Sequence, residues 1–263
     1  MKQLATIIIC SFTLGVAACQ IDLSSSVESP TALASAGTAQ PQPAAENAGV
    51  NADTQGGGEN TEQVVDEAQH PAAQLIAAFA EPSQPNGELL ILYGQVIDVH
   101  GNPVPNSVVE IWQTDASGVY DHPSDPETAT RDMTFQFYGT AIVDHAGWYA
   151  FRTVVPGRYE PRPRHIHYKV KQNDNVLLTS QFYFSDDIIE VEGEGMFRAV
   201  GEGGELLLLQ LVQGEESLLA NGQIVVDTGI GIGELSLTPS QGEGPYYPVV
   251  SLVDYDNDLV ILD

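Results

Sequence analysis

Cysteine and basic residues are both scarce in this chain. Its 263 residues include 2 cysteines, and 9 lysines and arginines stand against 36 acidic residues. The formal net charge of -27 argues against nucleic acid and anionic membrane surfaces as partners. Cys10 lies in an N-terminal apolar run and Cys19 directly follows that run, so we expect no disulfide in the mature protein. Its hydrophobic core must stabilise the fold unaided.

The N-terminus has the features of a secretory signal. Residues 1–18 combine Lys2, an apolar run and small residues, and the run is too short for a standard membrane-spanning helix. Val16-Ala17-Ala18-Cys19 is typical of a bacterial lipobox, which predicts a lipidated Cys19; ordinary signal-peptidase cleavage is the alternative. We expect an exported protein whose only membrane contact is a lipid anchor in the cell envelope. An outer-membrane destination is expected because the two residues after Cys19 are Gln20 and Ile21, with no aspartate between Cys19 and Asp22.

Composition divides the rest of the chain into three parts. Residues 19–78 are rich in small and polar residues, which predicts a disordered low-complexity tether. Residues 79–228 alternate short apolar runs with turn residues, which predicts an all-β fold, a β-sandwich of mostly antiparallel strands. Residues 229–263 form a C-terminal segment. The predicted strands are Leu89–Ile97, Ser107–Gln113, Thr140–Val143, Trp148–Val154, His165–Lys171, Val176–Phe184, Glu205–Val212 and Gln223–Asp227.

Two histidines in the sequence RPRHIHYKV suggest a metal site. Because side chains alternate along a strand, His165 and His167 point to one face and Ile166 points into the core. Two imidazoles on one face of a rigid strand make half of a metal site. The alternative is an ordinary half-buried strand with its polar residues outward.

Two tyrosines could supply the other half of the site. Tyr120 and Tyr159 each follow a glycine turn, in two stretches that share a strand, a turn and a second strand. Tyrosine is usually a half-buried core residue. A phenolate is also a hard oxygen donor that suits Fe(III), and a trivalent ion stabilises the deprotonated phenol. Two phenolates, two neutral imidazoles and one hydroxide would give Fe(III) five ligands and no net charge.

Seven of the nine basic residues fall between Arg131 and Lys171, the stretch that also holds the histidines. On so acidic a protein such a cluster indicates an anionic ligand. An equally good explanation is that these cations offset neighbouring carboxylates.

Four stretches resemble one enzyme family closely. They are LYGQVIDVHGNPVPNSVVEIWQTDASGVYDHPSD, VDHAGWYAFRTVVPGRY, RPRHIHYKV and TSQFYFSDD, and together they run from about Gly87 to Asp187. They resemble the intradiol ring-cleavage dioxygenases, the family of protocatechuate and catechol dioxygenases. The resemblance implies a non-haem Fe(III) enzyme that cleaves a catechol-type aromatic diol with O2 to a muconate-type diacid. It is compatible with a homodimer.

The resemblance also implies residue roles. Tyr159 would leave the iron when substrate binds and accept a substrate proton. Arg162 would stabilise developing charge on the substrate, and Gln181 would lie behind the ligands without binding the metal. Arg164 stands where the family has a small or apolar residue, and it either binds an acidic substrate or faces solvent. The implied iron ligands are Tyr120, Tyr159, His165 and His167.

The spacing after the second tyrosine departs from part of the family. Only two residues separate Tyr159 from Arg162, where many protocatechuate enzymes resemble this region but carry a longer insertion. Loop contacts to a substrate carboxylate are therefore in doubt.

The C-terminal segment carries a second departure from the family. LTPSQGEGPYYP, residues 237–248, resembles a segment that the family carries before its first core strand. A circular permutation or a truncated second copy would explain this order. We expect residues 238–263 to fold back beside Leu89–Val96 and to place Gly244, Pro245 and Tyr246 at the rim of a substrate pocket. A disordered tail or an edge strand is the alternative.

Two other functions compete with catalysis. A non-catalytic, transthyretin-like β-sandwich binding module would have the same strand and turn pattern, but it would not need two tyrosines and two histidines. A metal-sequestering lipoprotein would use the same four side chains without turnover.

Overall fold

The computed structural model describes residues 75, 86–249 and 255–260. All of these residues belong to one compact unit, residues 58–263. The predicted signal peptide, most of the predicted tether and the lipidation site Cys19 lie outside the described residues. Within the described part, no helix is long and apolar enough to cross a membrane.

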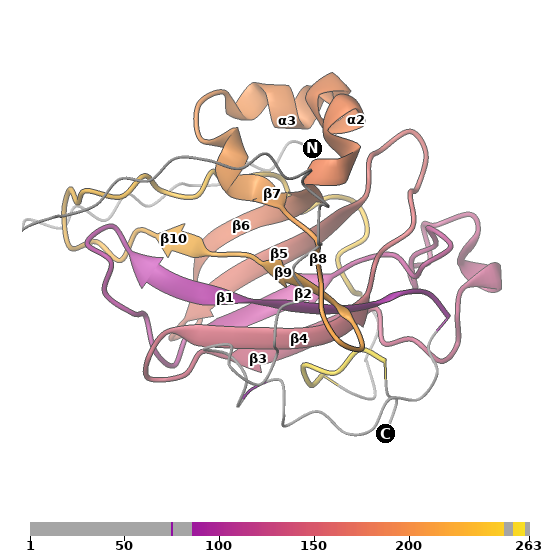
Figure 1. Ribbon diagram of the computed structural model, residues 1–263, viewed down its shortest axis with the longest axis horizontal. Helices are drawn as coiled ribbons and strands as arrows, with labels where there is room; N and C mark the ends of the chain where they lie inside the picture. Colours follow the sequence, from indigo (N-terminus) through magenta and orange to yellow (C-terminus); the bar gives the residue numbers. More distant parts are fainter. Residues whose placement is uncertain (1–74, 76–85, 250–254, 261–263) are drawn as a thin grey trace, which may run out of the picture. The chain divides into compact units, whose positions relative to one another are not determined.

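Two five-stranded sheets form the sandwich, as the alternating pattern predicts (Figure 1). In the first sheet, β1 pairs with β4 along one edge and with β9 and then β10 along the other, while β8 continues the sheet from β9. The second sheet has the order β3-β2-β5-β6-β7. The first sheet contains β1 (Leu89–Asp98), β4 (Trp148–Val154), β8 (Val212–Gln213), β9 (Leu218–Asn221) and β10 (Ile224–Val226). The second contains β2 (Val108–Trp112), β3 (Tyr138–Ile142), β5 (His165–Gln172), β6 (Asn175–Phe184) and β7 (Leu208–Leu209).

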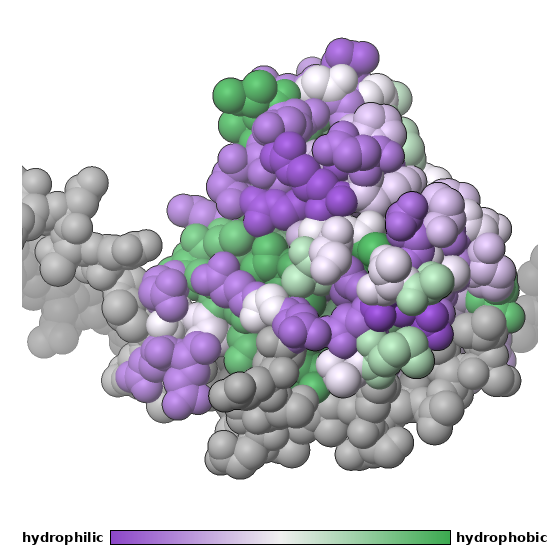
Figure 2. Space-filling view, turned by 90° about the vertical axis from the view of Figure 1, so that its right-hand side faces the viewer, coloured by the Kyte–Doolittle hydropathy of each residue, from purple (hydrophilic) through white to green (hydrophobic). Residues whose placement is uncertain are grey.

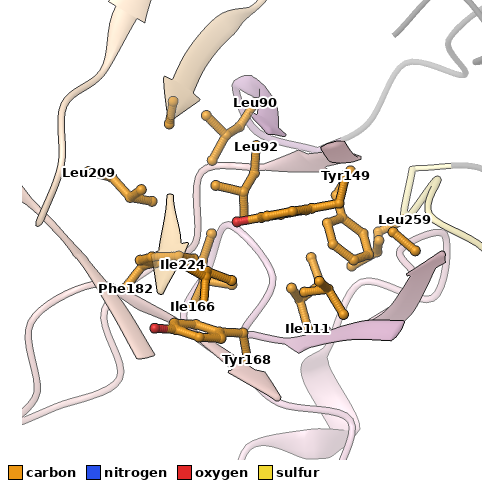
Figure 3. Close-up of a cluster of buried hydrophobic side chains, with 14 of the residues drawn as sticks. Leu90, Leu92, Ile111, Tyr149, Ile166, Tyr168, Phe182, Leu209, Ile224 and Leu259 are labelled. Carbon is orange, nitrogen blue, oxygen red and sulfur yellow. The ribbon is translucent and has the colours of Figure 1, made fainter. Parts of the chain in front are cut away.

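The core lies between the two sheets. Figure 3 shows Leu90 and Leu92 of β1 and Tyr149 of β4 facing Ile166 and Tyr168 of β5. All five side chains are fully buried. Because Ile166 and Tyr168 alternate with the histidines along β5, filling the core with apolar side chains turns the histidines toward the outer face of the second sheet.

Three turns share one local design, D-x-x-G, which appears at Asp98, Asp115 and Asp144. In each turn the glycine N–H donates to the aspartate carbonyl, at 3.0–3.1 Å, and the glycine has a positive φ. The aspartate carboxylate also accepts two backbone N–H groups from inside or just after the turn, at 2.8–3.1 Å. Aspartate and glycine therefore specify these turns through hydrogen bonds and backbone freedom. His100 and His145 lie in two of these turns.

The predicted strand Glu205–Val212 is wrong. This stretch contains a 3-10 helix followed by the two-residue strand β7, and β9 was not predicted. Helices precede this stretch. The sequence there is rich in glycine and glutamate, so it cannot alternate apolar and polar residues as a strand does. The helical elements are η2 (Thr128–Thr130), η3 (Ser185–Asp187), α2 (Ile188–Gly193), α3 (Gly195–Val200) and η4 (Gly204–Leu207). Hydrophilic residues gather at the top of Figure 2, the end that carries α2 and α3 in Figure 1.

The C-terminal segment packs on the sandwich, but not along Leu89–Val96 as predicted. Both edges of β1 are already paired with other strands. The segment instead crosses the outer face of the second sheet and then reaches β3 and β4. Thr140 N–H donates to the carbonyl oxygen of Tyr255 at 2.9 Å, and Leu259 N–H donates to that of Arg152 at 2.8 Å. Leu259 is fully buried in the core.

A buried ion pair fastens this end of the chain. Arg152 of β4 donates from Nε to Asp258 at 2.9 Å, and a second bond joins the same two side chains. Their side chains are 6% and 9% exposed. Removing one charge would leave the other buried without its partner.

We therefore expect Asp258→Asn to lower the free energy of unfolding by about 3–5 kcal/mol. Urea unfolding of the domain, followed by tryptophan fluorescence, measures this change. Glu202→Gln, at an exposed position, is the control and should stay within about 0.5 kcal/mol of the wild type. Equal stability of Asp258→Asn and the control would show that the ion pair does not hold the segment.

Candidate metal centre

Strand β5 presents the two histidines between two neighbouring strands. His165 lies opposite Tyr183 of β6, and His167 lies between Gln181 of β6 and Trp112 of β2. The Trp112 and His167 rings stack with centroids 5.0 Å apart and an interplanar angle of 3°. Trp112 is buried and lies at the site. Strand register thus sets the neighbours of both imidazoles.

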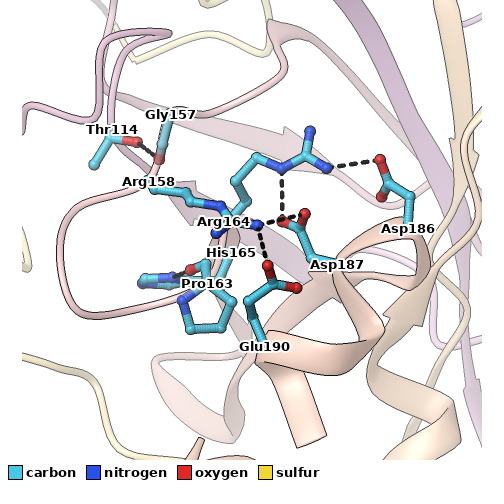
Figure 4. A network of polar contacts seen from close by, with 9 residues as sticks. All are labelled: Thr114, Gly157, Arg158, Pro163, Arg164, His165, Asp186, Asp187 and Glu190. Carbon is cyan, nitrogen blue, oxygen red and sulfur yellow. Dashed lines mark hydrogen bonds and ion pairs between the residues drawn. The ribbon is translucent and has the colours of Figure 1, made fainter. Parts of the chain in front are cut away.

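The two glycine turns that precede the tyrosines pack directly against each other. A Cβ atom on Gly118 would lie 2.0 Å from the carbonyl oxygen of Arg158, and one on Gly157 would lie 2.3 Å from the backbone nitrogen of Gly118. Thr114 Oγ1 also donates to the Gly157 carbonyl at 2.9 Å (Figure 4). Only residues without side chains allow this approach, so it sets the distance between the chain segments that lead to Tyr120 and Tyr159.

The four predicted ligand side chains come together. Tyr120 Oη lies 3.4 Å from His165 Nε2. The ring centroids of the two histidines are 4.8 Å apart, those of the two tyrosines are 5.6 Å apart, and those of Tyr159 and His165 are 6.0 Å apart. Tyr120, His165 and His167 are buried and Tyr159 is half-buried. Two oxygen and two nitrogen donors from three chain segments therefore surround one point.

Both histidines are neutral. Burial, with the nearby Arg162 charge, lowers the pKa of His165 to about 3. Burial, with His165 and the Arg162 charge nearby, lowers the pKa of His167 well below its usual value. His165 Nδ1 donates to the carbonyl oxygen of Pro163 at 2.8 Å, which leaves the lone pair on Nε2, the atom beside Tyr120 (Figure 4). A carbonyl that orients a histidine in this way is typical of metal sites.

The tyrosines need a cation to ionise. Burial raises the pKa of Tyr120 far above its ordinary value, and the neighbouring Tyr159 raises it further. A phenolate would be costly here unless a highly charged ion were bound beside it. Among the described residues, no group of three or more histidine, cysteine, aspartate or glutamate side chains is arranged to hold a metal. A metal held by His165 and His167 would therefore need the tyrosine oxygens as further donors.

Gly244 lies against the Nε2 edge of His167. A Cβ atom at Gly244 would lie 3.1 Å from Cε1 and 3.3 Å from Nε2 of His167, so a larger residue there would crowd this edge of the ring. His167 Nδ1 is buried without a hydrogen bond. A hard trivalent cation suits this set of two phenol oxygens and two neutral imidazoles. The residues present therefore fit the metal that the resemblance implies.

Arg162 lies beside the four donor groups. Its NH1 donates to His165 Nε2 and its NH2 to Gln181 Oε1, both at 3.0 Å. Its Nε donates to Glu194 at 2.5 Å, with the two side chains only 12% and 11% exposed. The structure thus brings Arg162 and Gln181 to the centre, and adds Glu194, which was not predicted. Glu194 lies in a glutamate-rich run whose local pattern does not single it out.

Each cation of the basic cluster has a carboxylate partner. Arg164, a candidate for binding an acidic substrate, instead pairs with Asp186 and Asp187, both at 2.7 Å (Figure 4). These ion pairs neutralise the Arg164 charge, and a role of Arg164 in binding an acidic substrate stays a prediction. The explanation by local neutralisation accounts for the whole cluster. The pairs are Arg131–Asp121, Arg152–Asp258, Arg158–Asp187, Arg162–Glu194, Arg164–Asp187, Lys169–Glu243 and Lys171–Glu110.

The C-terminal segment covers the centre. The Tyr246 ring lies 4.7 Å from that of Tyr120 and 5.4 Å from that of Tyr159. Tyr247 Oη donates to Glu110 at 3.0 Å, and the ring of Tyr247 meets Trp112 edge-on at 4.9 Å. Lys169 Nζ lies 3.7 Å from the centroid of the Tyr247 ring. Gly244 and Tyr246 thus lie against the donor groups, whereas Pro245 is exposed between them.

A family model described as "Dioxygenase" matches residues 64–200, which is 137 residues and just over half of the chain. The chain belongs to the intradiol ring-cleavage dioxygenase family. It is 33% identical over 150 residues to the catechol 1,2-dioxygenase of Acinetobacter baylyi, covering 48% of this chain and 47% of that protein. It is 38% identical over 112 residues to the protocatechuate 3,4-dioxygenase beta chain of Burkholderia cepacia, covering 40% of this chain and 48% of that protein.

The chain spans about half the length of these curated relatives. Among solved structures, it is similar to the dioxygenase domain of a dioxygenase carbohydrate-binding protein fusion from Streptomyces sp. SirexAA-E. That similarity has a TM-score of 0.42 and 28% identity, and it covers 56% of this chain and 84% of the other. Membership of the dioxygenase family makes the convergence of Tyr120, Tyr159, His165 and His167 a candidate catalytic metal centre.

The packing of the two glycine turns can be tested at a position with ordinary backbone geometry. Gly157→Ala would force a methyl group against the backbone of the other turn, so we expect a loss of about 1–3 kcal/mol of stability and a displaced Tyr159. Chemical unfolding and the iron content after loading measure the two effects. Gly193→Ala, whose methyl group meets no atom within 4 Å, is the control and should be neutral or stabilising. Normal iron content in Gly157→Ala would contradict the argument.

Proposed function

We propose that this protein catalyses non-haem Fe(III)-dependent intradiol cleavage of a catechol-type aromatic diol by dioxygen, giving a muconate-type diacid. The convergence of two tyrosines and two neutral histidines beside Arg162 is the observation that carries the proposal. Tyr120, Tyr159, His165 and His167 would hold the iron. Family membership supports cleavage of catechols as the general reaction.

The reaction balances without a further oxidant. One molecule of catechol and one of dioxygen give one molecule of muconic acid, with no hydrogen gained or lost. The bond between the two hydroxylated carbons breaks, and both oxygen atoms enter the product. Bound Fe(III) would supply the Lewis acidity and redox character that let a diol react with dioxygen. Everything else must come from side chains that bind, orient and protect the substrate.

The proton and charge roles follow from position. Tyr159 is the more exposed of the two tyrosines, so it is better placed than the buried Tyr120 to take a proton from an entering diol. The Arg162 guanidinium is held by Glu194 and Gln181 and would face negative charge that develops on the substrate ring. Gln181 holds Arg162 through its side-chain oxygen. Tyr246 and Gly244 would exclude water from the same space.

We expect the iron-loaded domain to absorb in the visible region through tyrosinate-to-iron charge transfer, and the band to shift when catechol is added. Tyr120→Phe should weaken the band and lower iron affinity by at least ~10-fold, because one of four donor groups is lost. Tyr255→Phe, an exposed tyrosine of the C-terminal segment, is the matched control and should leave the band unchanged.

Oxygen consumption separates catalysis from storage. An iron-loaded protein that binds catechol and consumes no oxygen would support the metal-sequestering alternative. A colourless protein that takes up no iron would reject both catalysis and metal sequestration, and it would favour the non-catalytic binding module.

We propose further that the protein is exported and anchored to the cell envelope by a lipid on Cys19, with the outer membrane as the destination. The lipobox-like Val16-Ala17-Ala18-Cys19 supports this proposal. Cys19→Ser in the full chain should move the protein from the membrane fraction to the soluble fraction of lysed cells. Membrane association that persists in Cys19→Ser would contradict the lipid anchor.

A further inference from the structure

Glu194 introduces a negative charge into the centre. It lies between α2 and α3, and its Oε1 accepts from Arg162 Nε. The same guanidinium reaches His165 Nε2 at 3.0 Å, so the glutamate lies one side chain away from the metal-binding donors. Its other oxygen, Oε2, is buried without a hydrogen bond. The carboxylate thus pairs with the guanidinium through one oxygen only.

Among the described residues, the two cations that contact the lining of the centre are each paired with a carboxylate. Arg162 is matched by Glu194 and Lys169 by Glu243. Asp125 adds a further buried carboxylate, which accepts the backbone N–H of Tyr120 at 2.8 Å. In formal charges, these five groups sum to -1.

The rest of the lining is neutral. Gln181 contributes an amide whose Nε2 is buried without a hydrogen bond. Aromatic rings dominate the space around the donors, and they suit the face of an uncharged ring. These rings are Trp112, Tyr120, Tyr159 and Tyr246.

We propose that Glu194 is the specificity-determining residue of this site, and that it restricts the substrate to catechols whose ring carries no carboxylate. This inference rests on the proposed function. Glu194 neutralises the Arg162 guanidinium, which lies beside the donor groups, and its field opposes any anion that enters the same partly buried space. Two like charges a few ångströms apart in such surroundings change binding by roughly 10- to 100-fold.

The test compares catechol with 3,4-dihydroxybenzoate on the full, iron-loaded protein. The wild type should prefer catechol by ~100-fold in kcat/KM. Glu194→Gln keeps an oxygen that can accept from Arg162 but removes the charge, so it should lower this preference at least ~10-fold through a smaller KM for 3,4-dihydroxybenzoate. Glu194→Asp keeps the charge and should keep the preference. Glu192→Gln, an exposed glutamate of α2, is the control and should behave as the wild type.

Binding without turnover provides a second readout. Calorimetric dissociation constants, measured without oxygen, should show the same change in preference in Glu194→Gln, even if that variant lowers kcat for both compounds. A merely structural role would weaken the binding of both compounds equally.

Three results would overturn the proposal. A wild type that cleaves both compounds with similar kcat/KM, or a Glu194→Gln variant whose ratio of dissociation constants is unchanged, would reject the role of Glu194 and leave the proposed function standing. A wild type that neither binds nor cleaves either compound would reject the proposed function together with this inference.

Discussion

The close approach of two glycine turns is the contact on which the rest of the centre depends. Gly118 and Gly157 belong to separate parts of the chain, and each precedes one of the two tyrosines by two residues. Because neither carries a side chain, the two backbones touch, and both tyrosines enter the same space. The histidines come from β5, whose position is set independently by its pairing with β2 and β6. Rigid strands and touching turns therefore hold the donors in place before any ligand binds.

Burial of the histidine face is the second requirement. On an open sheet, His165 and His167 would be solvated and able to protonate near neutral pH. The C-terminal segment covers them with Gly244 and Tyr246 and is held by the Lys169–Glu243 and Arg152–Asp258 pairs. Because this segment excludes water from the histidines, the imidazoles stay neutral and their lone pairs stay available. The end of the chain is thus part of the site that the middle of the chain builds.

Much of the fold was predictable from local patterns. Six of the predicted strands correspond to β1 to β6, because alternating apolar residues and D-x-x-G turns are local signals that packing does not override. The predicted strand Gln223–Asp227 also matches β10, whereas Glu205–Val212 was mispredicted, because an apolar run after a glycine- and glutamate-rich stretch fits a helix end, a strand or a loop equally well. Short strands such as β7 and β9 exist only because β6 and β1 present free edges to them.

By itself, the sequence determined which residues could serve as donors. Alternation along a strand places His165 and His167 on one face, and the motifs around Tyr120 and Tyr159 indicate a dioxygenase. Tertiary structure alone decided which charges lie together. Arg164 and Arg162 are two residues apart, yet one pairs with Asp187 on one side of the chain while the other meets Glu194 beside the donors. Ion pairs between distant segments depend on how helices and strands pack, and no local pattern encodes that packing.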